Sequence, residues 1–232
     1  MSMFDFVAAT CGKCGTETEI EVVVSVNADR RPDLRAQILD GSFQAMACPS
    51  CAARLRIPPE FVHLDMRRGQ WIAAHPADAL AQWPDIERTA AEAYDDAFGA
   101  GAPAVVRELA ANVTPSAVFG WPALRERLLC ADLDLAPATL EVVKMAIIAR
   151  GGLEWNIAEE LRLVDGDAVA LRFELMDSAT EEPRASLQVP RAAYDAVVDD
   201  PDPWQALRRV IAGGLFIDVR RALVATADAS VE

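Results

Sequence analysis

Four cysteines near the N-terminus form two C-x-x-C pairs, Cys11 with Cys14 in C-G-K-C-G and Cys48 with Cys51 in C-P-S-C. Four thiolates can fill the tetrahedral shell of a Zn²⁺ ion, with bonds of about 2.3 Å. The spacer between the pairs is longer than the common one of about 15–20 residues, but the entropic cost of loop closure rises only slowly with length. Because four thiolates leave no position for water or substrate, the predicted zinc site is structural rather than catalytic.

The turns after the two pairs differ in sequence. Gly15 follows the first pair, where the chain must turn back with a positive φ that glycine adopts at little cost. Ala52 stands at the corresponding place after the second pair. This difference predicts a less tightly wound second turn.

A thiol–disulfide function of Cys48 and Cys51 is an alternative to the metal site. A redox dithiol is activated when its thiol lies at a helix N-terminus, which lowers the thiol pKa. The following residues 54–59 (R-L-R-I-P-P) instead predict a short strand ended by prolines. The redox interpretation is therefore the weaker one, and it stays open.

The two cysteine pairs, with C-P-x-C as the second, resemble those of bacterial CpXC-domain proteins. Residues 118–128 (V-F-G-W-P-A-L-R-E-R-L) and 141–144 (E-V-V-K) are similar to the continuation of that family. The resemblance covers about the first two thirds of the chain. It implies a zinc-binding module at the four cysteines, and it implies no particular activity.

The other residues that could do chemistry do not form a known catalytic signature. His63 and His75 are the only histidines, and both are expected to be ordinary surface or boundary residues. Acidic clusters are expected to be solvated; they are Glu92 with Asp96, Glu159-Glu160 and Asp199-Asp200-x-Asp202. Glu181-Glu182 and Asp199–Asp202 are the acidic segments of the C-terminal unit expected to steer a partner. Cys130 lies in an apolar stretch and is expected to be a small buried side chain. We therefore predict no catalytic residues and lean toward a protein that is not an enzyme.

Charge argues against nucleic acid as the general partner. The formal net charge is −14. Up to residue 76 there are eight Lys/Arg and nine Asp/Glu, and from residue 77 onward fourteen and twenty-seven. Nucleic-acid affinity is built from Lys and Arg contacts to phosphates. A zinc ribbon that binds nucleic acid remains an alternative because the first part contains seven arginines: Arg30, Arg31, Arg35, Arg54, Arg56, Arg67 and Arg68.

Three consecutive segments must position these residues. In residues 1–76 we expect a zinc-ribbon-like module with strands over 4–7, 18–26 and 43–47, a helix over 32–39, and a hairpin of 61–66 with 70–74. In residues 77–152 we expect helices over 84–99, 104–111, 122–129 and 138–150, the last stopped by Gly151.

The third segment, residues 153–232, predicts a small α+β unit. Strands over 161–164 and 169–175 form a hairpin around D-G-D, and 185–189 adds a third strand. A helix over 191–198 follows, and then a helical pattern over 204–224 that Gly213-Gly214 should bend or split. The whole chain is therefore predicted to be α+β, with an N-terminal zinc-ribbon-like module, helices, and a C-terminal antiparallel meander with helices.

These observations favour a cytoplasmic, zinc-binding interaction protein. Paired C-x-x-C motifs suit a reducing compartment, and neither a signal peptide nor a membrane span is expected. The expected partner is another protein, bound by the acidic surface of the C-terminal unit, with no nucleic acid and no membrane.

Overall fold

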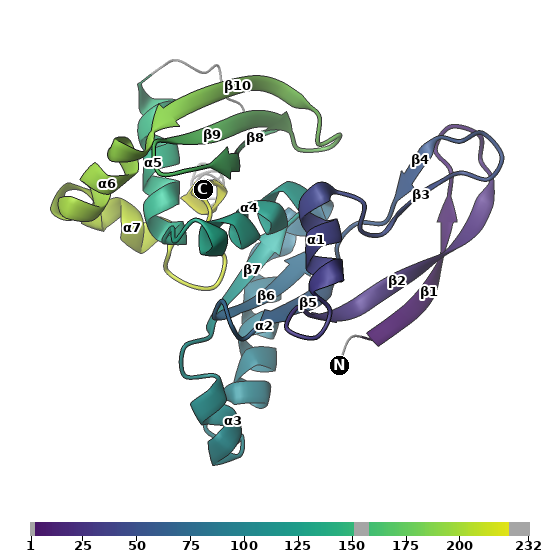
Figure 1. Ribbon diagram of the computed structural model, residues 1–232, viewed down its shortest axis with the longest axis horizontal. Coiled ribbons are helices and arrows are strands. Elements are labelled where there is room, and N and C mark those ends of the chain that lie inside the picture. Colours follow the sequence, from purple (N-terminus) through teal and green to yellow (C-terminus); the bar gives the residue numbers. More distant parts are fainter. Residues whose placement is uncertain (1–2, 151–157, 223–232) are drawn as a thin grey trace, which may run out of the picture.

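A mixed five-stranded sheet with the order β1-β2-β5-β6-β7 organises the N-terminal part of the chain (Figure 1). The computed structural model describes residues 3–150 and 158–222. The strands of this sheet are β1 (Met3–Thr10), β2 (Glu17–Asn27), β5 (Phe61–Asp65), β6 (Gln70–His75) and β7 (Thr114–Phe119). The pairs β1·β2 and β5·β6 are antiparallel, and β2·β5 and β6·β7 are parallel. The predicted hairpin of residues 61–74 is confirmed.

The β1–β2 hairpin extends beyond the sheet as an arm (Figure 1). Only Ser25–Asn27, at the end of β2, pair with β5, whereas β1 pairs with β2 down to Thr10. Near the end of the arm, β3 (Ala45–Ala47) and β4 (Arg54–Arg56) form a second, short antiparallel ribbon. The arm brings the β1–β2 turn and the β3–β4 turn together at its tip.

Helices cover both faces of the five-stranded sheet. On one face, α1 (Pro32–Asp40) and α4 (Trp121–Asp132) close a core in which the rings of Phe43, Phe61 and Trp121 lie 5.5–5.9 Å apart. On the other, α2 (Trp83–Phe98) packs on Trp71. The remaining elements here are η1 (Ala77–Gln82) and α3 (Ala104–Leu109).

Strand β7 is absent from the sequence-based prediction. Its sequence T-P-S-A-V-F has no alternating pattern, and Pro115 interrupts it. The strand forms because it pairs in parallel with β6, from Gln70 opposite Thr114 onward. The five-stranded sheet therefore continues beyond residue 76, where the first segment was expected to end.

A three-stranded antiparallel sheet with the order β10-β9-β8 forms the C-terminal unit, and the predicted α+β class is confirmed. Helix α7 ends before Gly213, so the long helical pattern is split there as expected. The expected stop at Gly151, the start of this unit near Leu153 and the end of the helical pattern near Val224 lie outside the described residues. The elements are α5 (Pro137–Ala149), β8 (Glu159–Gly166), β9 (Ala170–Asp177), β10 (Pro183–Pro190), α6 (Arg191–Asp199), η2 (Asp202–Trp204) and α7 (Gln205–Ile211).

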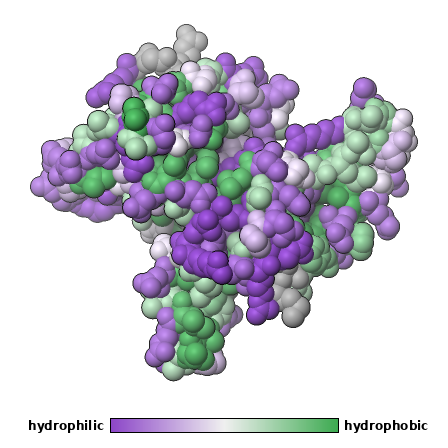
Figure 2. All heavy atoms as spheres, in the orientation of Figure 1, coloured by the Kyte–Doolittle hydropathy of each residue, from purple (hydrophilic) through white to green (hydrophobic). Residues whose placement is uncertain are grey.

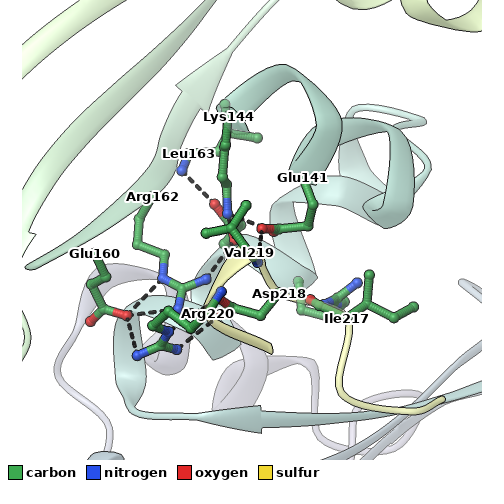
Figure 3. Close-up of polar contacts among 11 residues, drawn as sticks. Glu141, Lys144, Glu160, Arg162, Leu163, Ile217, Asp218, Val219 and Arg220 are labelled. Atoms are coloured by element: carbon green, nitrogen blue, oxygen red, sulfur yellow. Dashed lines mark hydrogen bonds and ion pairs between the residues drawn. The ribbon is translucent and has the colours of Figure 1, made fainter. Parts of the chain in front are cut away.

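A buried network of charged side chains joins the two sheets through α4 (Figure 3). Lys144 Nζ lies 2.5 Å from Glu126 Oε1 and 2.6 Å from Glu141 Oε1. Arg162 of β8 lies 2.9 Å from the same Glu126 oxygen. The network is completed by Glu160, Asp218 and Arg220, and its side chains are at most 5% exposed.

Pairing offsets the effect of burial unequally among these groups. Burial raises the pKa of Glu126, but Lys144 and Arg162 outweigh it and hold this pKa below its usual range. The pKa of Glu141 is raised, because burial and the nearby Asp218 and Glu126 carboxylates together exceed the effect of Lys144. The network contains four carboxylates and three cations, so one carboxylate has no cation of its own. The raised pKa of Glu141 is consistent with this imbalance.

Removing one cation should therefore be costly. We expect Lys144→Met to lower the free energy of unfolding by about 3–5 kcal/mol, because Glu126 and Glu141 would keep buried charges without their ammonium partner. Urea denaturation measures this change. Arg88→Met is the matched control: Arg88 pairs with Glu92 and Asp85 on the exposed face of α2, and its loss should cost less than about 1 kcal/mol. Equal costs for the two variants would contradict this account.

Candidate metal centre

The structure brings the four predicted cysteines together at the tip of the arm. Their Sγ atoms all lie within 4.8 Å of one another, with Cys11 and Cys51 3.7 Å apart and Cys14 and Cys48 3.6 Å apart. Four sulfurs around one ion at about 2.3 Å would be about 3.8 Å apart in a tetrahedron. The spacing therefore fits one tetrahedrally coordinated metal ion. All four cysteines are free thiols.

The same backbone geometry forms both cysteine turns. The Gly15 N–H donates to the Cys11 carbonyl (2.8 Å), and the Ala52 N–H donates to the Cys48 carbonyl (2.9 Å). Gly15 has φ 72° and Ala52 has φ 57°. The expectation of a looser second turn is wrong: Ala52 adopts the left-handed conformation at a cost of about 1–2 kcal/mol. In this conformation Cys48 and Cys51 both reach the four-thiol group.

The environments of the four thiols are unequal. Cys11 and Cys48 are buried, Cys51 is half-buried and Cys14 is exposed. The Thr16 hydroxyl, 3.2 Å from Cys14 Sγ, and the Thr16 main chain lower the pKa of Cys14 to about 6. The Ala53 main chain lowers the pKa of Cys51, but the other three thiols and burial outweigh it and raise this pKa to about 12. Thiols this close oppose one another's ionisation, and a bound cation would remove that opposition.

Comparison with known proteins agrees with this geometry. The CpXC protein family matches residues 9–144, which include all four cysteines and more than half of the chain. The chain belongs to the CpXC family. No match was found among curated proteins or among solved structures.

The CpXC match ends at Lys144, which pairs with two carboxylates of the buried charge network. Residues 118–128 and 141–144, which carried the resemblance in the sequence, contain Glu126, Glu141 and Lys144. The three-stranded sheet lies beyond the matched residues. The family part of the chain therefore supplies the four-thiol group, strands β2, β5, β6 and β7 of the five-stranded sheet, and three of the seven charged side chains of the network.

The C-P-S-C turn does not precede a helix. Cys51 is followed by β4, which pairs with β3. A helix N-terminus that would activate a Cys48 thiolate is therefore absent from this part of the described chain. The predicted short strand over residues 54–56 is confirmed.

Both histidines lie away from the thiol group. His63, which was expected at the surface or a boundary, is fully buried in β5, and within the described residues neither of its ring nitrogens has a hydrogen-bond partner. Its burial has a local reason, since β5 has strands on both sides and helices on both faces of the sheet. His75 is half-buried beside Phe119. Cys130 is buried as predicted, and burial raises its pKa to about 12.

The arginines of the first segment do not form one basic face. Most of them are paired locally with carboxylates: Arg31 with Asp33, Arg35 with Asp65 and Asp132, Arg56 with Glu181, Arg67 with Asp29, and Arg68 with Asp65 and Asp132. Arg54, which has no carboxylate partner in the described residues, and the paired Arg56 line a cleft together with Arg125. Arg125 has no predicted role, and its place among the family-like residues 118–128 is the one signal for it in the sequence.

The acidic clusters fall into two kinds. Glu92, Asp96, Glu182, Asp199, Asp200 and Asp202 are exposed as expected. Glu160 is buried in the charge network, and Glu181 pairs with Arg56 at 3.2 Å. The expectation of solvated carboxylates is therefore wrong for Glu160, which pairs with the nearby Arg162 and with Arg220, 3.2 Å away and distant in the sequence. Glu181, expected in the partner-binding surface, is held by a distant arginine instead.

The thiol group predicts a metal-dependent tip. We expect one metal ion per chain by elemental analysis, and strong loss of metal in Cys48→Ser, because a hydroxyl is a poor ligand where a soft thiolate is needed. Chelation should speed amide exchange in the β3–β4 ribbon and the ends of β1 and β2, since the apolar cluster there is small. Cys130→Ala is the control and should keep the metal. A folded, metal-free protein with slow exchange at the tip would contradict this prediction.

His63 predicts a loss of stability in acid. Burial lowers its pKa to about 4, with Asp65 opposing and Arg35 and Arg68 adding to the effect. The unfolded chain, with a pKa near 6.5, binds the proton first. The contribution of His63 to the free energy of unfolding is therefore fully present above about pH 6.5. It falls by about 3 kcal/mol as the pH drops toward 4.

The measurement is urea denaturation of the wild type and of His63→Leu at pH 7 and pH 4.5. We expect the variant to lose less stability between these two pH values than the wild type. An equal loss in both proteins would show that His63 does not control this pH range.

Proposed function

We propose that this CpXC protein is a non-enzymatic, zinc-binding interaction protein of the cytoplasm, in which zinc supports folding and the C-terminal unit binds another protein. Four thiolates around one ion favour Zn²⁺, and they leave no coordination position for a substrate. Among the described residues, no helix has the length and apolar character of a membrane span.

The observation that carries the partner-binding proposal is the open edge of the three-stranded sheet. Strand β10 is the outer strand, and its side chains are exposed or half-exposed along its whole length. An outer strand offers unpaired N–H and C=O groups to a partner strand. β8, at the other edge, packs against α4.

Acidic residues near this edge favour a basic partner. Asp199, Asp200 and Asp202 are exposed after α6, and in the described part of the chain none of them has an ion pair. Such carboxylates steer a positively charged partner and add to its specificity. Glu181, predicted to belong to this surface, is occupied by Arg56, and Glu182 precedes β10, at the end opposite α6 (Figure 1), so the surface consists of the three aspartates.

Exposed apolar residues mark two competing surfaces. Figure 2 shows hydrophobic residues over α3, where Val105 and Leu109 are 62% and 67% exposed. On β1, Met3 and Phe6 are 59% and 63% exposed. β1 is also an outer strand, and Glu17, Glu19 and Glu21 of β2 are exposed beside it, so it is the competing edge. We favour β10 because it lies in the part of the chain, from residue 77 onward, that has fourteen Lys/Arg and twenty-seven Asp/Glu.

Charge reversal tests the proposal. We expect Asp199→Lys/Asp200→Lys/Asp202→Lys to lose the partner that cross-links to β10 in the native host, with fold and metal content unchanged. The matched control reverses three exposed acids elsewhere, Glu19, Asp96 and Glu108, and should retain the partner. Partner capture that is equal in both variants would overturn the proposal, and so would cross-links confined to α3 or β1.

A further inference from the structure

A cleft of about 970 Å³ lies where the metal-bearing arm, α4 and the C-terminal unit meet. Arg54 and Arg56 of β4 and Arg125 of α4 line it, and the β9–β10 turn closes one side with Glu181. Three guanidinium groups on one cleft are unusual in a chain with a net charge of −14. Their convergence is created by the fold, because Arg125 is about 70 positions from the other two.

Arg56 is the central residue of this cleft, and the hydrogen-bonding capacity of its guanidinium group is only partly used. Its guanidinium lies over the Trp121 ring, 4.2 Å from the centroid, and its side chain is 14% exposed. Nη1 pairs with Glu181, while Nε and Nη2 are buried and have no hydrogen-bond partner among the described residues. A guanidinium has five N–H donors in a planar fork that matches carboxylate and phosphate groups. Arg56 is therefore positioned to bind more oxygen atoms than it now does.

The other two arginines are fixed by the end of α1. Arg125 Nε donates to the Ile38 carbonyl (3.1 Å), and Arg54 Nη2 donates to the Gly41 carbonyl. These contacts use carbonyls that a helix C-terminus leaves unpaired, and they hold both side chains at the cleft without a carboxylate partner in the described residues. Burial lowers the pKa of Arg56 to about 10, and the charges of Arg125 and Arg54 add to this effect. The three cations repel one another, and an anion between them would relieve that repulsion.

Glu181 supplies part of that negative charge from inside the protein. It belongs to the C-terminal unit, beyond the residues that match the family. Its φ of 58° is a left-handed conformation that a glutamate adopts at a cost. The neighbouring Asp177 holds the turn: its side chain accepts hydrogen bonds from the Ala179 and Thr180 N–H groups and pairs with Arg184. Asp177 is therefore directed away from the arginines, and the remaining acids at the cleft, Asp78 and Glu182, are exposed.

We propose that this cleft binds a small polyanion through Arg54, Arg56 and Arg125, and that Glu181 occupies the site as an internal substitute for one of the ligand's oxyanion groups. The ligand class is a small molecule with two or more phosphate or carboxylate groups, since Glu181 is the one cleft carboxylate that pairs with any of the three arginines in the described residues. Binding displaces Glu181 and couples the family part of the chain to the β9–β10 turn. The site is separate from the acidic surface beside β10, so either can be wrong without the other.

Glu181→Gln is the decisive variant, because the proposal predicts a gain of binding. Calorimetric titration at constant ionic strength uses pyrophosphate in one arm and citrate in the other. We expect weak binding by the wild type, at least tenfold tighter binding by Glu181→Gln, and no gain in the control Glu108→Gln, which removes the same charge from exposed α3. Binding of pyrophosphate alone, citrate alone or both supports the proposal and identifies the ligand chemistry.

Arginine variants locate the binding site. Arg56→Met in the Glu181→Gln background should abolish the gain, with the methionine stem still packed on Trp121. Because Arg56 is mostly buried, Arg54→Met is the second test: Arg54 is exposed, and its loss should weaken binding several-fold in a protein that remains folded. The proposal is overturned if neither probe binds, if Glu181→Gln binds no tighter than the wild type, or if binding is unchanged by Arg54→Met.

Discussion

Burial of charge is the constraint on which the rest of this structure depends. Glu126 accepts contacts from Lys144, from Arg162 and from the main-chain N–H of Leu163 (2.6 Å). These partners come from α5 and β8, so α4 cannot occupy its place unless the C-terminal sheet is docked on it. The segment after α7 completes the network, with Asp218 2.7 Å from Arg162. A buried ion left without its partner costs more than the pair contributes, which makes the arrangement specific as well as stable.

The four-thiol group lies apart from this network, in a small apolar cluster at the tip of the arm. The apolar cluster at the tip of the arm contains Ile20 and Leu55 with two of the cysteines, and it is not continuous with the core under α1 and α4. So small a cluster cannot order the β3–β4 ribbon by hydrophobic burial alone. A metal ion bound by four thiolates would supply the missing free energy. The ion would thereby also fix the position of β4, whose arginines face the cleft.

The cleft links these two constraints. Arg56 is placed by the β3–β4 ribbon beside the four-thiol group, Arg125 by the helix that carries Glu126, and Glu181 by the sheet that the charge network docks. A change at either the tip or the network would therefore reach the cleft through rigid elements.

The sequence by itself determined most local structure and the candidate metal ligands. The C-x-x-C spacing predicts the four-thiol group because both pairs lie on short turns, and β-branched runs and D-G-D predict β2 and the β8–β9 hairpin from local preference alone. Only the tertiary structure decided the position of β7, the burial of His63 and the partners of Lys144 and Glu181. These features depend on contacts between residues far apart in the chain. A lysine in E-V-V-K-M or an arginine between Leu161 and Leu163 has the same local pattern whether its partner is water or a buried carboxylate.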